Sequence, residues 1–181
     1  EGIVASPQRF PLPTAIVVQQ QGGFVAPGAD ERGQIESGSP SGVLHLAADS
    51  LRNSGIADLQ LGNGDPSAQA LPIAFLGDVT LRTSRSVTLD AVSLDAMAST
   101  SASAGAGAGA ASKGWTGAGH ARIEAPYVSI LGLGGSQSPQ VGDGLLDVVA
   151  DAIDMGGLLA LRGWANTTFT SSGDIRFVAP S

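Results

Sequence analysis

The chain of 181 residues contains no cysteine. This absence excludes disulfide bonds, thiolate metal sites and thiol catalysis, and it separates the chain from small extracellular domains that depend on disulfides. The two histidines, His45 and His120, fall at different positions of the repeat described below, so they do not form a pair suited to a transition metal. The sequence therefore predicts no metal and no other cofactor.

Basic and aromatic residues are also scarce. Nine Lys and Arg residues stand against 16 Asp and Glu, which gives a net charge of −7, and only 4% of the residues are aromatic. A nucleic-acid-binding surface needs clustered basic side chains, commonly with aromatic rings that stack on bases. The sequence therefore predicts no nucleic-acid partner.

Long hydrophobic runs are missing as well. The longest, such as AIVV at residues 15–18, fall far short of the roughly 20 residues that a transmembrane helix needs. We therefore expect no membrane insertion, although 43% apolar content is enough for a folded core.

The sequence does contain an internal repeat. Five stretches begin with glycine and then place apolar residues at alternate positions, and they read GVLHLAA, GDVTLRT, GHARIEA, GLLDVVA and GDIRFVA, from Gly42, Gly77, Gly119, Gly144 and Gly173. Such alternation is typical of a strand with one buried face. When the insertions are left out, successive glycines of the repeat are separated by roughly 20–30 residues, which is the length of one solenoid repeat. Such repeats stack on their neighbours.

This pattern predicts an all-β fold, a parallel β-helix with loop insertions. The alternative is a β-sandwich, which also shows many short alternating strands but does not require one motif to recur. The segment LLDVVADAIDM at residues 145–155 could form an amphipathic helix. Because it matches the repeat, we predict that it is strand.

The repeat makes two predictions about side chains. The third residue after each glycine should point outward, which would place Asp147 between Arg122 and Arg176 of neighbouring coils. The similar phrases GHARIEAP and GDIRFVAP, which begin 54 residues apart, should then occupy the same face of two coils. The fourth residue should point inward, so that one stack contains Leu46, Leu81, Ile123, Val148 and Phe177.

Composition suggests how the chain is divided. Residues 1–41 are expected to form an irregular segment and residues 42–181 the coils of the β-helix, with a low-complexity Ala, Ser and Gly insertion at about 97–114. Shorter loops are expected at 63–72 and 134–143. If the protein binds a partner, these three loops are the expected contact points, because irregular segments vary without disturbing a stacked core.

No residue is assigned a catalytic, cofactor-binding or metal-binding role. Glycan-cleaving enzymes need paired carboxylates, whereas the carboxylates here are scattered singly and most are expected to be solvated. Asn166 begins an Asn-x-Thr glycosylation triplet, but a Thr-rich strand that faces outward also explains these residues. Single aromatic side chains such as Tyr127, Trp115 and Trp164 more often pack at corners than contact a sugar. The scattered carboxylates are those of Asp90, Asp95, Asp147, Asp151 and Asp154. We therefore predict that the chain is not an enzyme.

The phrases SVTLDAVSLDA, GHARIEAPYVSILG, LLDVVADAIDMGG and SSGDIRFVAP resemble the filamentous haemagglutinin family of large bacterial exoproteins, which leave the cell by two-partner secretion. The resemblance covers roughly residues 42–181 and implies an interior segment of a right-handed β-helical shaft. Its motifs are structural, so it carries no functional residue to this chain.

The resemblance also implies a function and a location. The segment would be a structural or adhesive part of a virulence-associated adhesin that is secreted and displayed on the bacterial cell surface. An outer-membrane transporter would be its partner during export, and a glycan or protein of a host-cell surface would be its binding partner. The alternatives are a β-helical enzyme acting on polysaccharides and the passenger fragment of an autotransporter.

Overall fold

The computed structural model describes residues 13–22, 42–62, 70–98, 119–134 and 138–179. These residues form one 12-stranded sheet and one short helix. The elements, in chain order, are β1 (Ala15–Gln19), β2 (Val43–Ala47), α1 (Ala48–Ser54), β3 (Asp58–Gly62), β4 (Leu71–Leu76), β5 (Val79–Arg82), β6 (Ser86–Met97), β7 (His120–Glu124), β8 (Tyr127–Leu133), β9 (Gln140–Ala150), β10 (Ala152–Leu158), β11 (Ala160–Ser171) and β12 (Ile175–Val178).

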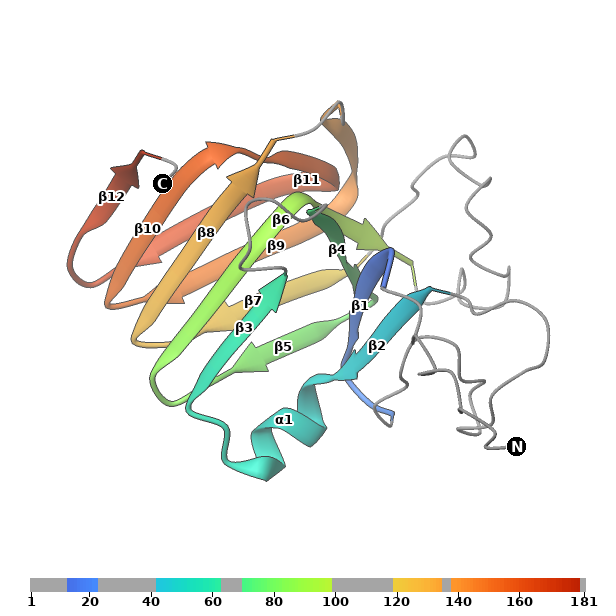
Figure 1. Ribbon diagram of the computed structural model, residues 1–181, viewed down its shortest axis with the longest axis horizontal. Coiled ribbons are helices and arrows are strands. Elements are labelled where there is room, and N and C mark those ends of the chain that lie inside the picture. The colour runs from blue at the N-terminus through green and yellow to red at the C-terminus, as the bar shows by residue number, and fades with distance from the viewer. Residues whose placement is uncertain (1–12, 23–41, 63–69, 99–118, 135–137, 180–181) are drawn as a thin grey trace, which may run out of the picture.

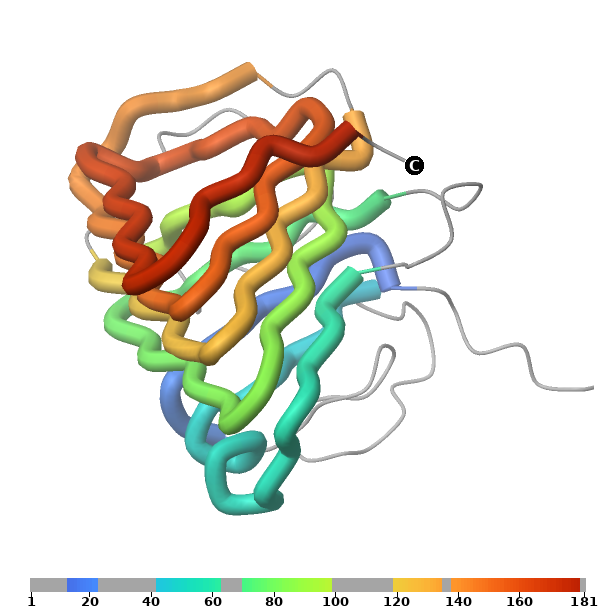
Figure 2. The backbone as a smooth tube through the Cα atoms, turned by 90° about the vertical axis from the view of Figure 1, so that its left-hand side faces the viewer, coloured from blue at the N-terminus to red at the C-terminus, as the bar shows by residue number. Residues whose placement is uncertain are grey.

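The strands lie in successive coils that stack on one another, as Figures 1 and 2 show. We name three faces by the strands that build them. The first face contains β3, the first half of β6, β8, β10 and β12. The second contains β2, β1, β4, the second half of β6 and the start of β11. The third contains β5, β7, β9 and the second half of β11.

Every pairing between the described strands is parallel. A β-sandwich is built from antiparallel strands, so the pairing contradicts that alternative and confirms the prediction of a parallel β-helix. The segment at residues 145–155 is strand, as predicted, and belongs to β9 and β10.

The core consists of apolar rows that run along the stack. On the third face, Leu81, Ile123 and Val148 occupy one register position, and each is 0% exposed. On the first face, Val87, Val128 and Ile153 share a position in the same way. Because parallel coils place equivalent residues above one another, each row buries its side chains against the next coil.

The predicted stack of five residues is confirmed for three of them and wrong for two. Leu46 is buried but belongs to the second face, where it pairs with Val18. Phe177 lies on the first face opposite Met155 and is 85% exposed. The phrases GHARIEAP and GDIRFVAP therefore occupy different faces, because β7 belongs to the third face and β12 to the first.

The helix α1 was not expected from the repeat. Its side chains Ala48 and Leu51 are buried in the core, and the helix packs against β5, the first strand of the third face (Figure 1). Gly55 ends it in the left-handed conformation at φ 72°, which glycine adopts without strain. This helix therefore covers the core at one end of the stack.

The structure corrects part of the expected division into an irregular segment at residues 1–41 and three loops. Within residues 1–41, Ala15–Gln19 form β1, which pairs with both β2 and β4. The expected loops at 63–72 and 134–143 extend too far, because β4 begins at Leu71 and β9 at Gln140. The low-complexity insertion lies outside the described residues except for its first two positions, 97 and 98.

Candidate binding surface

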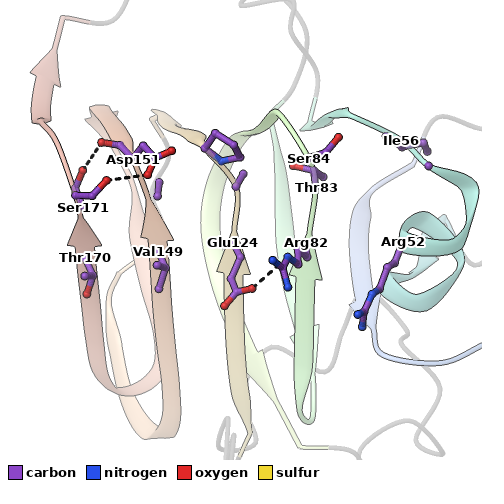
Figure 3. Close-up of a pocket in the computed structure, with 15 residues that line it drawn as sticks. Arg52, Ile56, Arg82, Thr83, Ser84, Glu124, Val149, Asp151, Thr170 and Ser171 are labelled. Atoms are coloured by element: carbon purple, nitrogen blue, oxygen red, sulfur yellow. Dashed lines mark hydrogen bonds and ion pairs between the residues drawn. The ribbon is translucent and has the colours of Figure 1, made fainter.

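A groove with a volume of about 780 Å³ runs along the corner between the third and first faces (Figure 3). Four coils contribute to it in the same way. One register position at or next to the end of each third-face strand lines it, together with the turn that follows. The strand-end residues are Arg82, Glu124, Val149 and Thr170, which lie side by side in the sheet register.

The chemical character of the groove changes along its length. At the end nearest α1 it is lined by the side chains of Arg52 and Arg82. Arg82 lies 3.6 Å from the carboxylate of Glu124. At the other end, Asp151 accepts a hydrogen bond from the hydroxyl of Ser172 at 2.7 Å. The groove therefore offers cationic, anionic and hydroxyl groups to a polar ligand.

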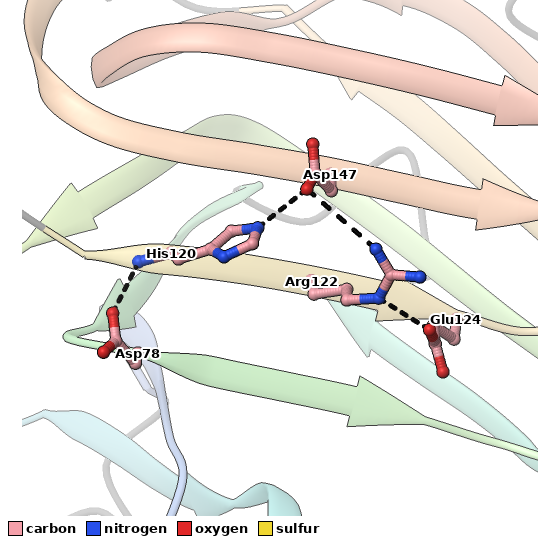
Figure 4. A network of polar contacts seen from close by, with 5 residues as sticks. All are labelled: Asp78, His120, Arg122, Glu124 and Asp147. Atoms are coloured by element: carbon pink, nitrogen blue, oxygen red, sulfur yellow. Dashed lines mark hydrogen bonds and ion pairs between the residues drawn. The ribbon is translucent and has the colours of Figure 1, made fainter.

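A polar network covers the neighbouring outer surface of the third face (Figure 4). The imidazole Nε2 of His120 lies 2.7 Å from Oδ2 of Asp147. Arg122 donates from Nε to Glu124 at 2.6 Å, and its Nη1 lies 4.0 Å from Asp147. The backbone N–H of His120 donates to Asp78 at 2.9 Å. Except for the contact between Arg122 and Glu124, which lies within β7, these contacts link neighbouring coils on the outer side of the third face.

The network corrects the predicted charge ladder. Asp147 is paired in register with Arg122, as expected, but its second side-chain partner is His120 rather than Arg176. Arg176 lies on the first face, where its Nε and Nη2 donate to Asp154 at 2.7 and 2.9 Å. Residue spacing alone could not distinguish the two faces.

We expect the substitution Asp147→Ala to lower the free energy of unfolding by no more than about 1 kcal/mol, because ion pairs in contact with solvent contribute little. Its side chain is 30% exposed, and that of its partner His120 is 44% exposed. Urea unfolding followed by circular dichroism measures the change. A loss of several kcal/mol would contradict the outward position of Asp147.

The expectation that most carboxylates are solvated is wrong for three of the five. Asp90, Asp95 and Asp154 are at most 7% exposed. Asp95 lies on the outer side of the second face, 3.8 Å from Nη1 of Arg162. Buried neighbours such as Val17 show that this side is also shielded from solvent.

The environments of these carboxylates shift their pKa values in opposite directions. Burial raises the pKa of Asp95, and the nearby Arg162 only partly offsets this effect. Hydrogen bonds from Arg176 and from the Tyr127 hydroxyl lower the pKa of Asp154. The Arg85 side chain and the Ser86 hydroxyl bind Asp58 and lower its pKa to about 2.

The remaining candidate residues have structural positions. Trp164 is 6% exposed, donates from its indole nitrogen to the carbonyl of Leu94, and packs edge-on against Phe75. Tyr127 is half-buried. Asn166 is exposed on β11, as an outward strand residue should be, and His45 is half-buried on β2. Trp115 lies outside the described residues.

Among the described residues, no three His, Asp or Glu side chains are grouped so that they could hold a metal ion. In the same part of the chain, no helix has the length and hydropathy needed to cross a membrane.

The sequence alone does not predict the groove. Its four strand-end residues are spread over almost 90 positions of the chain, from Arg82 to Thr170, and they share no residue type. The one available signal was their common position near the end of the third-face strands. No family model, curated protein or solved structure matches this chain.

Proposed function

We propose that this chain is a scaffold and adhesive segment of a bacterial exoprotein that is secreted and displayed on the cell surface. Its expected partner is a glycan or a protein on the surface of a host cell. The observation that supports the proposal is the groove, because successive coils line it with residues at equivalent register positions. Such a groove suits a linear, repeating ligand better than a compact one.

The charges of the groove indicate what the ligand would offer. Arg52 and Arg82 suit a carboxylate or sulfate group, while hydroxyl groups of a sugar suit the serine and threonine side chains near Asp151. An acidic polysaccharide combines both kinds of group. We therefore place an acidic glycan first among the candidate ligands.

The test is a binding screen of the folded chain against glycans and matrix proteins. The double variant Arg52→Ala/Arg82→Ala should weaken binding of acidic glycans by about tenfold or more, because two charge-assisted contacts are removed. Arg85→Ala is the control, since its exposed guanidinium pairs with Asp58 and does not line the groove. Equal affinities for both variants would contradict a role for the groove.

A second candidate function, cleavage of a polysaccharide, is suggested by the two carboxylates in the groove, Glu124 and Asp151. Glycan-cleaving enzymes use carboxylates as their general acid and base groups. The screen should therefore run beside assays of polysaccharide cleavage. Turnover that disappears in Glu124→Gln or Asp151→Asn would overturn the scaffold proposal.

The export route is part of the same proposal. The parallel coils and the phrases that resemble filamentous haemagglutinins support an interior shaft segment exported through an outer-membrane transporter. A passenger fragment of an autotransporter would have the same coils. Reading the gene next to the one that encodes the chain distinguishes the routes, because two-partner secretion predicts a transporter gene there.

A further inference from the structure

The groove along the corner between the third and first faces is lined by five successive coils. The helix α1 takes the place of a third-face strand in its coil, because it follows β2 of the second face, precedes β3 of the first face and packs against β5. Each coil contributes three lining residues, which are Arg52, Gly55 and Ile56 from the coil of α1 and residues 82–84, 124–126, 149–151 and 170–172 from the next four coils. The groove therefore presents its charged groups in the order of the coils.

Two arginine side chains supply positive charge at the α1 end of the groove. Arg52 is exposed, and no carboxylate of the described residues forms an ion pair with it. The side chain of Arg82 is 62% exposed and lies 3.6 Å from the carboxylate of Glu124, which is longer than a hydrogen bond. Glu124 accepts its hydrogen bond from Arg122 instead, at 2.6 Å. Both groove arginines are therefore available to an anionic group of a ligand.

The coil of β9 supplies a negative charge. Asp151 is exposed, and its carboxylate accepts a hydrogen bond from the hydroxyl of Ser172 at 2.7 Å. In the described part of the chain, no cationic side chain forms an ion pair with it. Its coil lies two strand spacings beyond that of Arg82, which is roughly 10 Å. Figure 3 shows Arg52 and Asp151 on opposite sides of Arg82 and Glu124, so the groove is electrically polarised along its length.

This order of charges separates two kinds of acidic glycan. In a uniformly acidic polymer every sugar carries a negative group, so a chain that extends from the arginines along the groove also places a negative group beside Asp151. Like charges brought together weaken binding and exclude the wrong ligand. A glycan with one acidic sugar and neutral sugars behind it places hydroxyl groups there instead. These hydroxyls can donate to Asp151 and exchange hydrogen bonds with Thr170 and Ser171.

We propose that the groove binds its glycan in one orientation, with a single acidic sugar at the α1 end and neutral sugars along the coils of β9 and β11. Arg52 and Arg82 hold the acidic group, and Asp151 discriminates against uniformly acidic polymers. This inference rests on the proposed function, because it assumes that the groove takes a glycan, and it narrows the ligand to chains with one acidic end.

The first test compares three short glycans by NMR titration of the folded chain. They are a neutral trisaccharide, the same trisaccharide with one sialic acid added at its end, and tetragalacturonate, which carries a carboxylate on every sugar. The sialylated chain should bind about tenfold or more tightly than the neutral one, because it adds charge-assisted contacts with both arginines. It should also bind more tightly than tetragalacturonate. Arg52→Ala should reduce the preference for the sialylated chain over the neutral one.

The second test removes the negative charge of the groove. Asp151→Asn keeps an oxygen that can accept from Ser172, and it should bind tetragalacturonate about two- to fivefold more tightly than the wild type, as expected for the loss of one exposed like-charge contact. Asp143→Asn is the matched control, because it makes the same change at an exposed residue of β9 that does not line the groove. It should not change the affinity for tetragalacturonate.

The outcomes separate this inference from the proposed function. If none of the three glycans binds, both are wrong. If tetragalacturonate binds at least as tightly as the sialylated chain, or if Asp151→Asn and Asp143→Asn change its affinity equally, only the inferred orientation and selectivity are wrong and an acidic glycan remains the ligand. Equal affinities for the neutral and sialylated chains would overturn the role given to Arg52 and Arg82.

Discussion

Replacing Ile123 by alanine is expected to lower the free energy of unfolding by about 2–5 kcal/mol, the range for removing a large aliphatic side chain from a packed core. Ile123 is 0% exposed and lies between Leu81 and Val148 in the central row of the third face. The substitution would leave a cavity between two neighbouring coils. These coils cannot move into the cavity without disturbing the parallel strand pairing of the third face.

The neighbouring substitution Arg122→Ala is the control, because it changes the same strand on its solvent side. The Arg122 side chain is 39% exposed, so its loss should cost no more than about 1 kcal/mol. Denaturant titrations should show a lower midpoint for Ile123→Ala with an unchanged slope. Similar midpoints for both variants would mean that the assigned facing of β7 is wrong.

Gly157→Ala is expected to lower the free energy of unfolding by about 2–5 kcal/mol, because two costs combine. Gly157 has φ 72°, and a Cβ there would lie 1.9 Å from the carbonyl oxygen of Gly132 in the coil below. The left-handed conformation alone costs an alanine about 1–2 kcal/mol. Relieving the overlap must also move the backbone of β8 or β10, because Gly132 and Gly157 are register partners.

Gly55→Ala separates these two costs. Gly55 has the same φ of 72°, but a Cβ there would have no heavy atom within 4 Å. This variant should therefore lose only about 1–2 kcal/mol. Thermal or urea unfolding of both variants measures the difference, and equal losses would show that the close approach of the two coils contributes nothing.

Asp95 illustrates what residue type alone could not predict. An aspartate on the outer side of a strand is expected to be solvated, yet Asp95 is 2% exposed. The second face is shielded on its outer side as well, where Val17, Val43 and Ala74 form a separate buried apolar cluster. Alternation along a strand indicates which residues share a side, but not whether both sides are covered.

The alternation of apolar residues is enough to predict the fold class and the local facing of most strands. Alternating apolar residues in GDVTLRT, GHARIEA and GLLDVVA are a local property, and these three stretches do stack in the predicted register. The face on which GDIRFVA lies is visible only in the folded chain, and it sets the partner of Arg176 and the exposure of Phe177. The physical reason is that the face depends on how many corners the chain turns between two copies, whereas alternation is the same on every face. The groove also arises only when coils stack, because its residues are neighbours across the sheet and not along the chain.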